Sequence, residues 1–270
     1  MAEIVLTAGV RQNLLQLQKT SDLITATQTR LATGKRVNSA LDNPINFFTA
    51  QGLSNRASDL SNLLDSMSNG INTIQAAGNG ITSITKLVQS AQALISQAQQ
   101  TADTAVRATL ATQFTAIRTQ IDQLSADSGF NGINLLNNNS LTVTLNETGT
   151  SSVTVTGVDF DSTGLAIDVA ANAWVADADI TAASTDLTAA LTTLRSQSQS
   201  FSTNLSTVQI RQDFTKAMIN TLQTGADALT LADSNEEGAN LLALQTRQKL
   251  STTALSLASQ ASQSVLRLFG

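Results

Sequence analysis

The chain has 270 residues, a formal net charge of −5 and a pI near 4.6, with only 3% aromatic and 13% charged residues. So few aromatic side chains favour burial along helical seams of Leu, Ile, Val and Ala over a compact enzyme core. Scattered Lys and Arg argue against nucleic acid, and the lack of His and Cys excludes the usual general base, thiol chemistry and disulfides. We therefore expect no catalytic residue, cofactor or metal. We also expect no membrane insertion, because no apolar stretch is long enough to cross a bilayer.

The first helical stretch carries a seam at alternating spacings of four and three residues, which is typical of a helix that packs along its length. Ser21 and Gln28 are assigned to two positions of this seam. Its apolar members are Val10, Leu14, Leu17, Ile24 and Leu31. This periodicity ends at Thr33.

The only proline of the chain follows a short break and reads as a helix start. Asn43 is a suitable N-cap, and Pro44 suits the first helical position, where its missing N–H costs nothing. A second seam then runs from Leu53 to Ile95, a helix about 65 Å long at 1.5 Å per residue. Gly78 and Gly80 within it indicate either a local bend or the close approach of a neighbouring backbone.

The middle of the chain changes character. A third helical pattern over 106–124 ends in Gly- and Asn-rich turns at 127–140, and residues 141–160 then alternate apolar and polar side chains. Residues 147–149 interrupt this alternation, which predicts a β-hairpin within a lobe that extends to about residue 175.

Helical spacing resumes from Leu191 to Leu229, and Ser234 with Glu237 matches a capping box for one last helix. The seam of that helix includes Leu250, Leu257, Val265 and Leu268. We therefore predict a mainly α fold: a long antiparallel coiled-coil-like helical rod formed by the N- and C-terminal halves, with a small central β-hairpin lobe. One pair of terminal helices buries only part of its apolar surface, so we expect these helices to dock onto copies of themselves.

Three polar clusters have structural interpretations. Gly34-Lys35 lacks the other residues of a phosphate-binding loop. Asp159, Asp161 and Gly164 lack the final Glu of a calcium loop, which favours a turn. The carboxylates at 233, 236 and 237 suit the positive end of a helix.

The chain resembles bacterial flagellin over essentially its full length. The matching stretches are RLATGKRVNSALDNP from residue 30, FNGINLL at 130–136, and the ending that closes in SVLRLF. The resemblance implies an inner layer, D0, made of the terminal helices and an outer layer, D1, made of the long helices and the hairpin. The implied divisions are 1–42 for the D0 N-terminal helix and spoke, 43–136 for the D1 N-terminal helices, 137–176 for the hairpin lobe, 177–233 for the D1 C-terminal helix and 234–270 for the D0 C-terminal helix.

The function that the resemblance implies is a structural one. It predicts a subunit that is exported unfolded through the flagellar type III apparatus and assembles, in many copies, into the hollow extracellular filament used for motility. Its expected partners are copies of itself, an export chaperone, and the hook-junction and cap proteins. The alternatives are a hook–filament junction protein or another secreted helical assembly protein.

The resemblance also assigns roles to individual residues. Self-assembly is expected through the terminal seams given above and Phe269. The spoke between the layers is expected to include Gly34, Arg36, Asn38, Asp42 and Pro44. Many flagellins carry an Arg-Glu pair that an innate-immunity receptor recognises, and Ala91 and Gln92 stand there in this chain.

Overall fold

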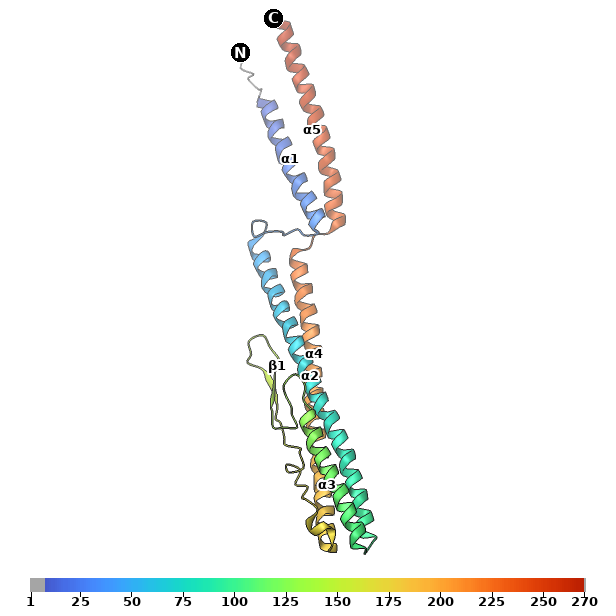
Figure 1. The fold of residues 1–270 in the computed structure, drawn as a ribbon. Helices are drawn as coiled ribbons and strands as arrows, with labels where there is room; N and C mark the ends of the chain where they lie inside the picture. The colour runs from blue at the N-terminus through green and yellow to red at the C-terminus, as the bar shows by residue number, and fades with distance from the viewer. Residues whose placement is uncertain (1–7, 270) are drawn as a thin grey trace. The chain divides into compact units, whose positions relative to one another are not determined.

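The computed structural model describes residues 8–269, with side chains described for residues 9–261, 263 and 264. Figure 1 shows its long helices and its hairpin. In chain order the elements are α1 (Ala8–Thr33), α2 (Pro44–Gln99), α3 (Thr104–Asp127), β1 (Leu141–Thr144), β2 (Ser152–Val155), η1 (Ala171–Trp174), α4 (Asp177–Thr230) and α5 (Ser234–Phe269). The predicted mainly α fold with a small central hairpin is therefore confirmed.

The chain forms two compact units. One consists of residues 56–220, and the other combines the two ends of the chain, residues 1–55 and 221–270. These divisions fall inside α2 and α4, so each of these helices contributes to both units. The predicted layer boundaries at 42/43 and 233/234 follow the ends of elements instead, and they stay a prediction.

Residues 56–220 pack α2, α3 and α4 around one hydrophobic core. The predicted seams of α2 and α4 supply much of it, including Ile74, Ile84, Leu194 and Val208. The amide of Gln212 in α4 donates to the hydroxyl of Ser68 in α2 at 2.9 Å. Three long helices therefore bury their apolar faces against one another within a single chain.

Gly70 and Gly80 of α2 lie where neighbouring side chains pack closely against the helix. The α2 helix runs unbroken through Gly78 and Gly80. A Cβ built at Gly80 would lie 2.7 Å from a methyl of Leu136, and one at Gly70 would overlap a methyl of Val143. Close approach of a neighbouring segment thus explains Gly80, although side chains, not backbone, make the contact. No atom lies within 4 Å of a Cβ built at Gly78.

The hairpin lies against this core. Strands β1 and β2 pair antiparallel, with Leu141 opposite Val155, and the buried side chains alternate with exposed ones. Its turn contains Glu147, which forms an ion pair with Arg56 of α2. The Glu147 carboxylate accepts a hydrogen bond from its own backbone N–H and another from Arg56, and these two bonds hold the pKa of this carboxyl below its usual value. The predicted interruption at 147–149 is confirmed as this turn, where Gly149 has a positive φ.

The FNGINLL segment fastens the end of α3. The Asn134 side chain donates to the carbonyl oxygens of Ser125 and Ala126 at 2.8 and 3.0 Å, and the Ser125 hydroxyl donates to the carbonyl of Leu136 at 3.0 Å. These bonds satisfy the last carbonyls of the helix, which have no intrahelical partner.

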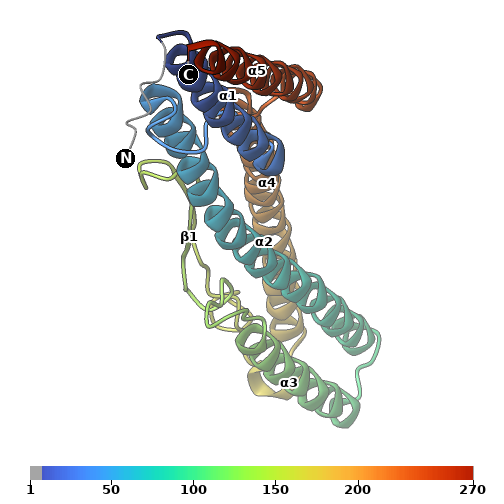
Figure 2. The ribbon, with the colours of Figure 1, turned by 90° about the horizontal axis from the view of Figure 1, so that it is seen from above.

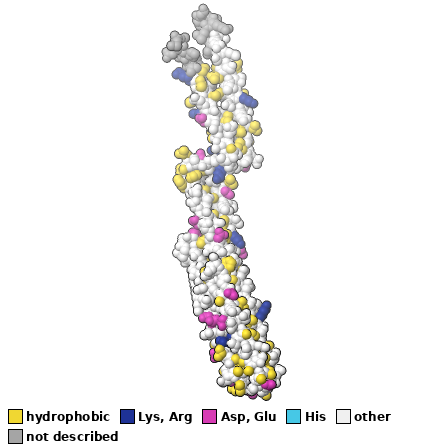
Figure 3. Space-filling model, viewed as in Figure 1, with side chains coloured by type: hydrophobic (Ala, Val, Ile, Leu, Met, Phe, Trp, Pro, Cys, Tyr) yellow, Lys and Arg dark blue, Asp and Glu magenta, His cyan; other side chains and the backbone are white. Residues whose placement is uncertain are grey.

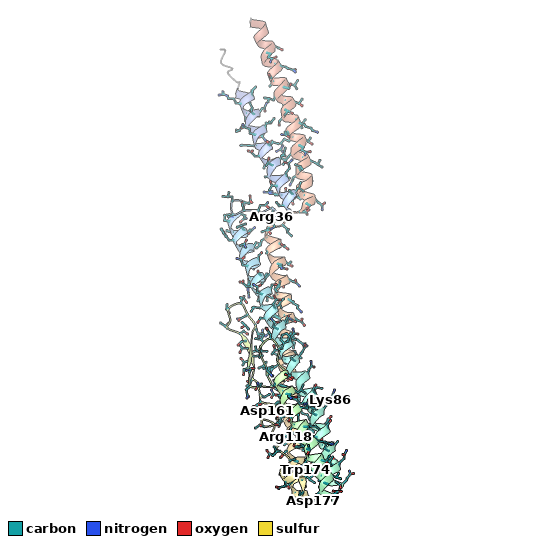
Figure 4. The ribbon with its side chains drawn as sticks, viewed as in Figure 1. Arg36, Lys86, Arg118, Asp161, Trp174 and Asp177 are labelled. Atoms are coloured by element: carbon teal, nitrogen blue, oxygen red, sulfur yellow. The ribbon has the colours of Figure 1, made fainter. Side chains whose placement is uncertain are left out.

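Further along, Arg118 of α3 holds the segment before η1. Its guanidinium donates to the carbonyl of Ile167 at 2.8 Å and to the hydroxyl of Ser162 at 3.1 Å. Figure 4 labels Arg118, Trp174 of η1 and Asp177, the first residue of α4. The indole of Trp174 is fully buried 5.1 Å from the ring of Phe114.

Burying this indole requires an unusual backbone. Asn172, Ala173 and Trp174 all have positive φ, which costs about 1–2 kcal/mol per residue for L-amino acids. Packing of the large indole on the core offsets that strain. Arg107 closes the turn, since it donates to the carbonyls of Thr101 and Val175 and pairs with Asp177 at 2.5 Å.

The other unit contains α1 and α5, which lie side by side in both views (Figures 1 and 2). It also contains the first turns of α2 and the last turns of α4, where the side chain of Leu53 faces Gly225. Asn43 caps α2, because its side-chain oxygen accepts from the N–H of Asn46 at 3.0 Å, and the helix begins at Pro44 as predicted.

Candidate assembly surface

The face of α1 that is covered within the chain differs from the predicted seam. Its less exposed positions are Val10, Asn13, Leu17, Thr20, Ile24, Thr27 and Leu31, with Arg30 next to the last of them. Leu14, Ser21 and Gln28 are exposed and do not lie on this covered face, so their place in a seam that meets other copies stays a prediction. The true spacing is three then four, and every second position is polar. Because Thr20 can donate to the carbonyl of Gln16 at 2.8 Å, it is buried without an unsatisfied hydroxyl.

The predicted seam of α5 is also not the face that meets α1. The face of α5 with reduced exposure contains Glu237, Leu241, Leu244, Gln248, Ser251, Leu255 and Ala258. Leu250 and Leu257 lie on another face and remain 67% and 62% exposed. The side chains of Val265, Leu268 and Phe269 lie outside the described residues.

The exposed face of α5 is apolar over several turns. We call it the α5 stripe, and it consists of Leu242, Leu250, Ala254, Leu257 and Ala261. On α1, Leu15 and Leu23 are likewise about half exposed. The predicted seams did not include Leu242, Leu15 and Leu23. Carried back from Leu250, the alternating spacing of three and four reaches Arg247 and Ala243 and does not reach Leu242.

A single ion pair ties the two helices within the part of the chain that carries described side chains. Glu237 of α5 is 8% exposed and lies 3.1 Å from the guanidinium of Arg30 in α1. The predicted capping box at Ser234 and Glu237 was therefore wrong. Asp233 caps α5 instead, since its carboxylate accepts from the N–H groups of Asn235 and Glu236, and Glu237 is free to reach α1.

The segment after α1 pairs with the segment between α4 and α5. Gly34 follows the last helical residue with φ +67°, a conformation that suits glycine, and its carbonyl accepts from the N–H of Ala232 at 3.0 Å. The N–H groups of Arg36 and Val37 both donate to the carbonyl of Thr230, at 2.8 and 3.3 Å. The ends of two helices are thus joined by a short backbone ladder.

Arg36 strengthens this junction through its side chain. Its guanidinium lies 3.4 Å from the carbonyl of Leu229, one of the last carbonyls of α4 (Figure 4). A cation is favourable at the carbonyl end of a helix, where the backbone dipoles leave negative partial charge.

Asn38 and Asp42 shape the loop that leads into α2. One carboxylate oxygen of Asp42 accepts the N–H groups of Asn38 and Ser39, each at 2.9 Å, and these backbone bonds hold the pKa of Asp42 below its usual value. The Asn38 amide donates to the carbonyl of Lys35 at 2.9 Å. The spoke residues are therefore consecutive parts of one hydrogen-bonded connector.

Other positions singled out in the sequence have structural roles. Asp161 accepts the N–H of Gly164 at 2.7 Å, which makes this acidic stretch a turn as predicted. Ala91 is buried in the α2 core, and Gln92 is partly exposed. Over the described residues we find neither a metal-binding group of His, Cys, Asp or Glu nor a helix apolar and long enough to span a membrane.

The described residues form long helices that pack along their length, and the paired helix α5 leaves an apolar stripe exposed. Such an arrangement is typical of structural proteins built from helices. The comparisons identify the family. The bacterial flagellin N-terminal helical region matches residues 7–141. Flagellin FljM of Caulobacter vibrioides is 31% identical over 267 residues, which cover 97% of this chain and 96% of that protein.

Two further flagellins are similar to this chain over nearly its full length. Flagellin FljK of the same organism is 30% identical over 97% of this chain and 96% of its own length, and a Brucella melitensis flagellin is 26% identical over 100% of this chain and 99% of its own length. A crystal structure of Bacillus cereus flagellin aligns to 57% of this chain and 88% of its own, at 17% identity and a TM-score of 0.48. The chain belongs to the bacterial flagellin family. It is a structural subunit of the extracellular flagellar filament, which is assembled from many copies.

Proposed function

We propose that the α5 stripe and the outward leucines of α1 are the surface through which copies of this chain dock in the filament. The single observation that carries this proposal is the exposure of Leu250 and Leu257 on a helix whose opposite face is already occupied. Covering Leu242, Leu250 and Leu257 contributes about 1–2 kcal/mol for each leucine, given their partial exposure in the single chain.

Docking of this kind couples ordering to assembly. A pair of helices that covers only one face of each retains a small share of its apolar burial, and every ordered residue costs conformational entropy. We propose that the segments 8–32 and 236–261 are disordered in the exported subunit and become helical where neighbouring copies cover the stripe.

We also propose an export route for the subunit and the partners that it meets on that route. A subunit of this kind leaves the cell unfolded through the flagellar type III apparatus, accompanied by an export chaperone. It is then inserted between the hook-junction proteins and the cap. The likeness to flagellins over nearly the full chain supports this route.

Seeded elongation tests the docking surface. Leu250→Asp and Leu257→Asp place a charge on the stripe, where burial would cost several kcal/mol, so we expect at least a 100-fold rise in the critical concentration. Ser256→Asp is the matched control, since this exposed residue of the same helix lies outside the stripe. Light scattering and electron microscopy report elongation, and normal filaments from both leucine variants would exclude this surface.

Hydrogen exchange tests the coupling. We expect the amides of residues 242–261 to be strongly protected in filaments and nearly unprotected in the monomer. Equal protection in the two states would rule out ordering on assembly, while leaving the docking surface to be judged by the elongation assay.

A further inference from the structure

A second apolar surface is exposed where α2 begins. Leu41 is 96% exposed in the preceding turn, and Ile45 and Phe48 on α2 are 78% and 64% exposed. Gly52 follows Phe48 by one helical turn on the same side of the helix, and its own position is exposed. We call Leu41, Ile45, Phe48 and Gly52 the α2 ridge, and Figure 3 shows apolar side chains gathered at this level of the chain.

The neighbouring side chain shows that this exposure is specific. Phe47 is half-buried and lines a hollow together with Val37 and Ala50, which are both buried. The ring centroids of Phe48 and Phe47 lie 5.5 Å apart in an edge-on arrangement, but Phe48 is not among the residues that line that hollow. One phenylalanine therefore serves the chain's own packing, and the other adds apolar surface that the chain does not cover.

Nothing among the described residues explains the glycine at position 52. Glycine is among the least favourable residues inside a helix, so it needs a local reason. Gly70 and Gly80 of the same helix have one, because a Cβ there would meet Val143 or Leu136. A Cβ at Gly52 would meet nothing within 4 Å, and its φ is not in the left-handed region.

We infer that the α2 ridge is a contact face for a second copy of this chain, and that Gly52 marks the point of closest approach. This inference rests on the chain being a filament subunit, for which another copy is the neighbour always present. The ridge has no charged side chain, and it belongs to the same compact unit as the α5 stripe. An open helical assembly needs contacts between unlike faces, and the ridge supplies a face distinct from the stripe.

Substitution of Gly52 separates folding from assembly. Gly52→Ala is expected to raise the folding equilibrium constant of the monomer by up to about fivefold, because alanine is the better helix residue. The same change is expected to raise the critical concentration for seeded elongation at least tenfold, and Gly52→Leu more strongly. Ser58→Ala, an exposed site of α2 outside the ridge, is the matched control and is expected to elongate normally. Native elongation by both Gly52 variants would overturn the inference.

Thiol labelling tests the ridge directly, because the chain has no cysteine of its own. Ile45→Cys is copolymerised as a minority with unlabelled native subunits, and its reaction with a maleimide is followed in monomers and in filaments. We expect labelling to be at least tenfold slower in filaments, and equal rates would overturn the inference. The elongation of Leu250→Asp reports separately on the α5 stripe, so failure of one proposal is distinguishable from failure of the other.

Discussion

The two compact units use similar helices in opposite ways. Among the described side chains, ten of the fifteen large hydrophobic residues that are exposed belong to residues 8–55 and 221–261, although residues 56–220 are the longer part. In 56–220, three helices and a hairpin surround one another, so apolar faces find partners in the same chain. In the other unit α1 and α5 form a pair, and a pair leaves the outer face of each helix open. The number of helices available, more than their composition, decides which region depends on neighbours.

The largest expected effect is a difference in monomer stability between two leucine-to-alanine substitutions, one in each unit. Leu194→Ala removes a fully buried side chain from the 56–220 core and is expected to cost the monomer about 2–5 kcal/mol of unfolding free energy. Leu250→Ala removes an exposed one and is expected to cost the monomer about 0.5 kcal/mol or less, while it weakens filament growth. Urea unfolding followed by circular dichroism measures both. Equal losses in the monomer would remove the distinction between the units.

A second comparison uses glycines of the same helix. Gly80→Ala forces a methyl against the side chains of Ser128 and Leu136. It is expected to destabilise the monomer by about 1–2 kcal/mol, because the cost of overpacking exceeds the gain in helix propensity. Gly52→Ala is expected to change stability in the opposite direction. Fluorescence of the single tryptophan, Trp174, follows unfolding of the 56–220 core. A stability gain in Gly80→Ala would show that the core yields to the added methyl.

The smallest expected effect is the loss of hydrogen bonds at low pH in the connector that contains Asn38 and Asp42. The pKa of Asp42 is held below its usual value of about 3.9, so its bonds to the N–H groups of Asn38 and Ser39 stabilise the connector above that pH and are lost as pH falls through the lowered pKa. Hydrogen exchange at these two amides is expected to lose protection in acid. In Asp42→Asn the protection is expected to be weaker and independent of this titration, and an unchanged acid transition in that variant would assign it to another group.

Local chemistry predicted much of this fold before any packing was known. Asn43 and Pro44 start α2 because their side-chain and backbone chemistry suits a helix N-terminus. The seams of α2 and α4 supply much of the core because large apolar residues occupy most of their positions. The turn at 147–149 followed from the break in alternation. The acidic turn at 159–164 followed in the same way, from spacing that lacked the last calcium ligand.

Tertiary packing determines which face of α1 and which face of α5 is buried, and the periodicity of the sequence does not. In α1 the residues next to one another at 20 and 21, and at 27 and 28, are all small or polar, so the sequence does not distinguish which of them faces a partner. The position of α5 selects Thr20 and Thr27. In α5 two faces carry apolar residues, and only the pairing with α1 determines that Leu241 and Leu244 are covered while Leu250 and Leu257 remain open. The periodicity of a helix predicts which of its faces can be buried. Which face is buried depends on the element that packs against it, and the sequence of one helix does not specify that element.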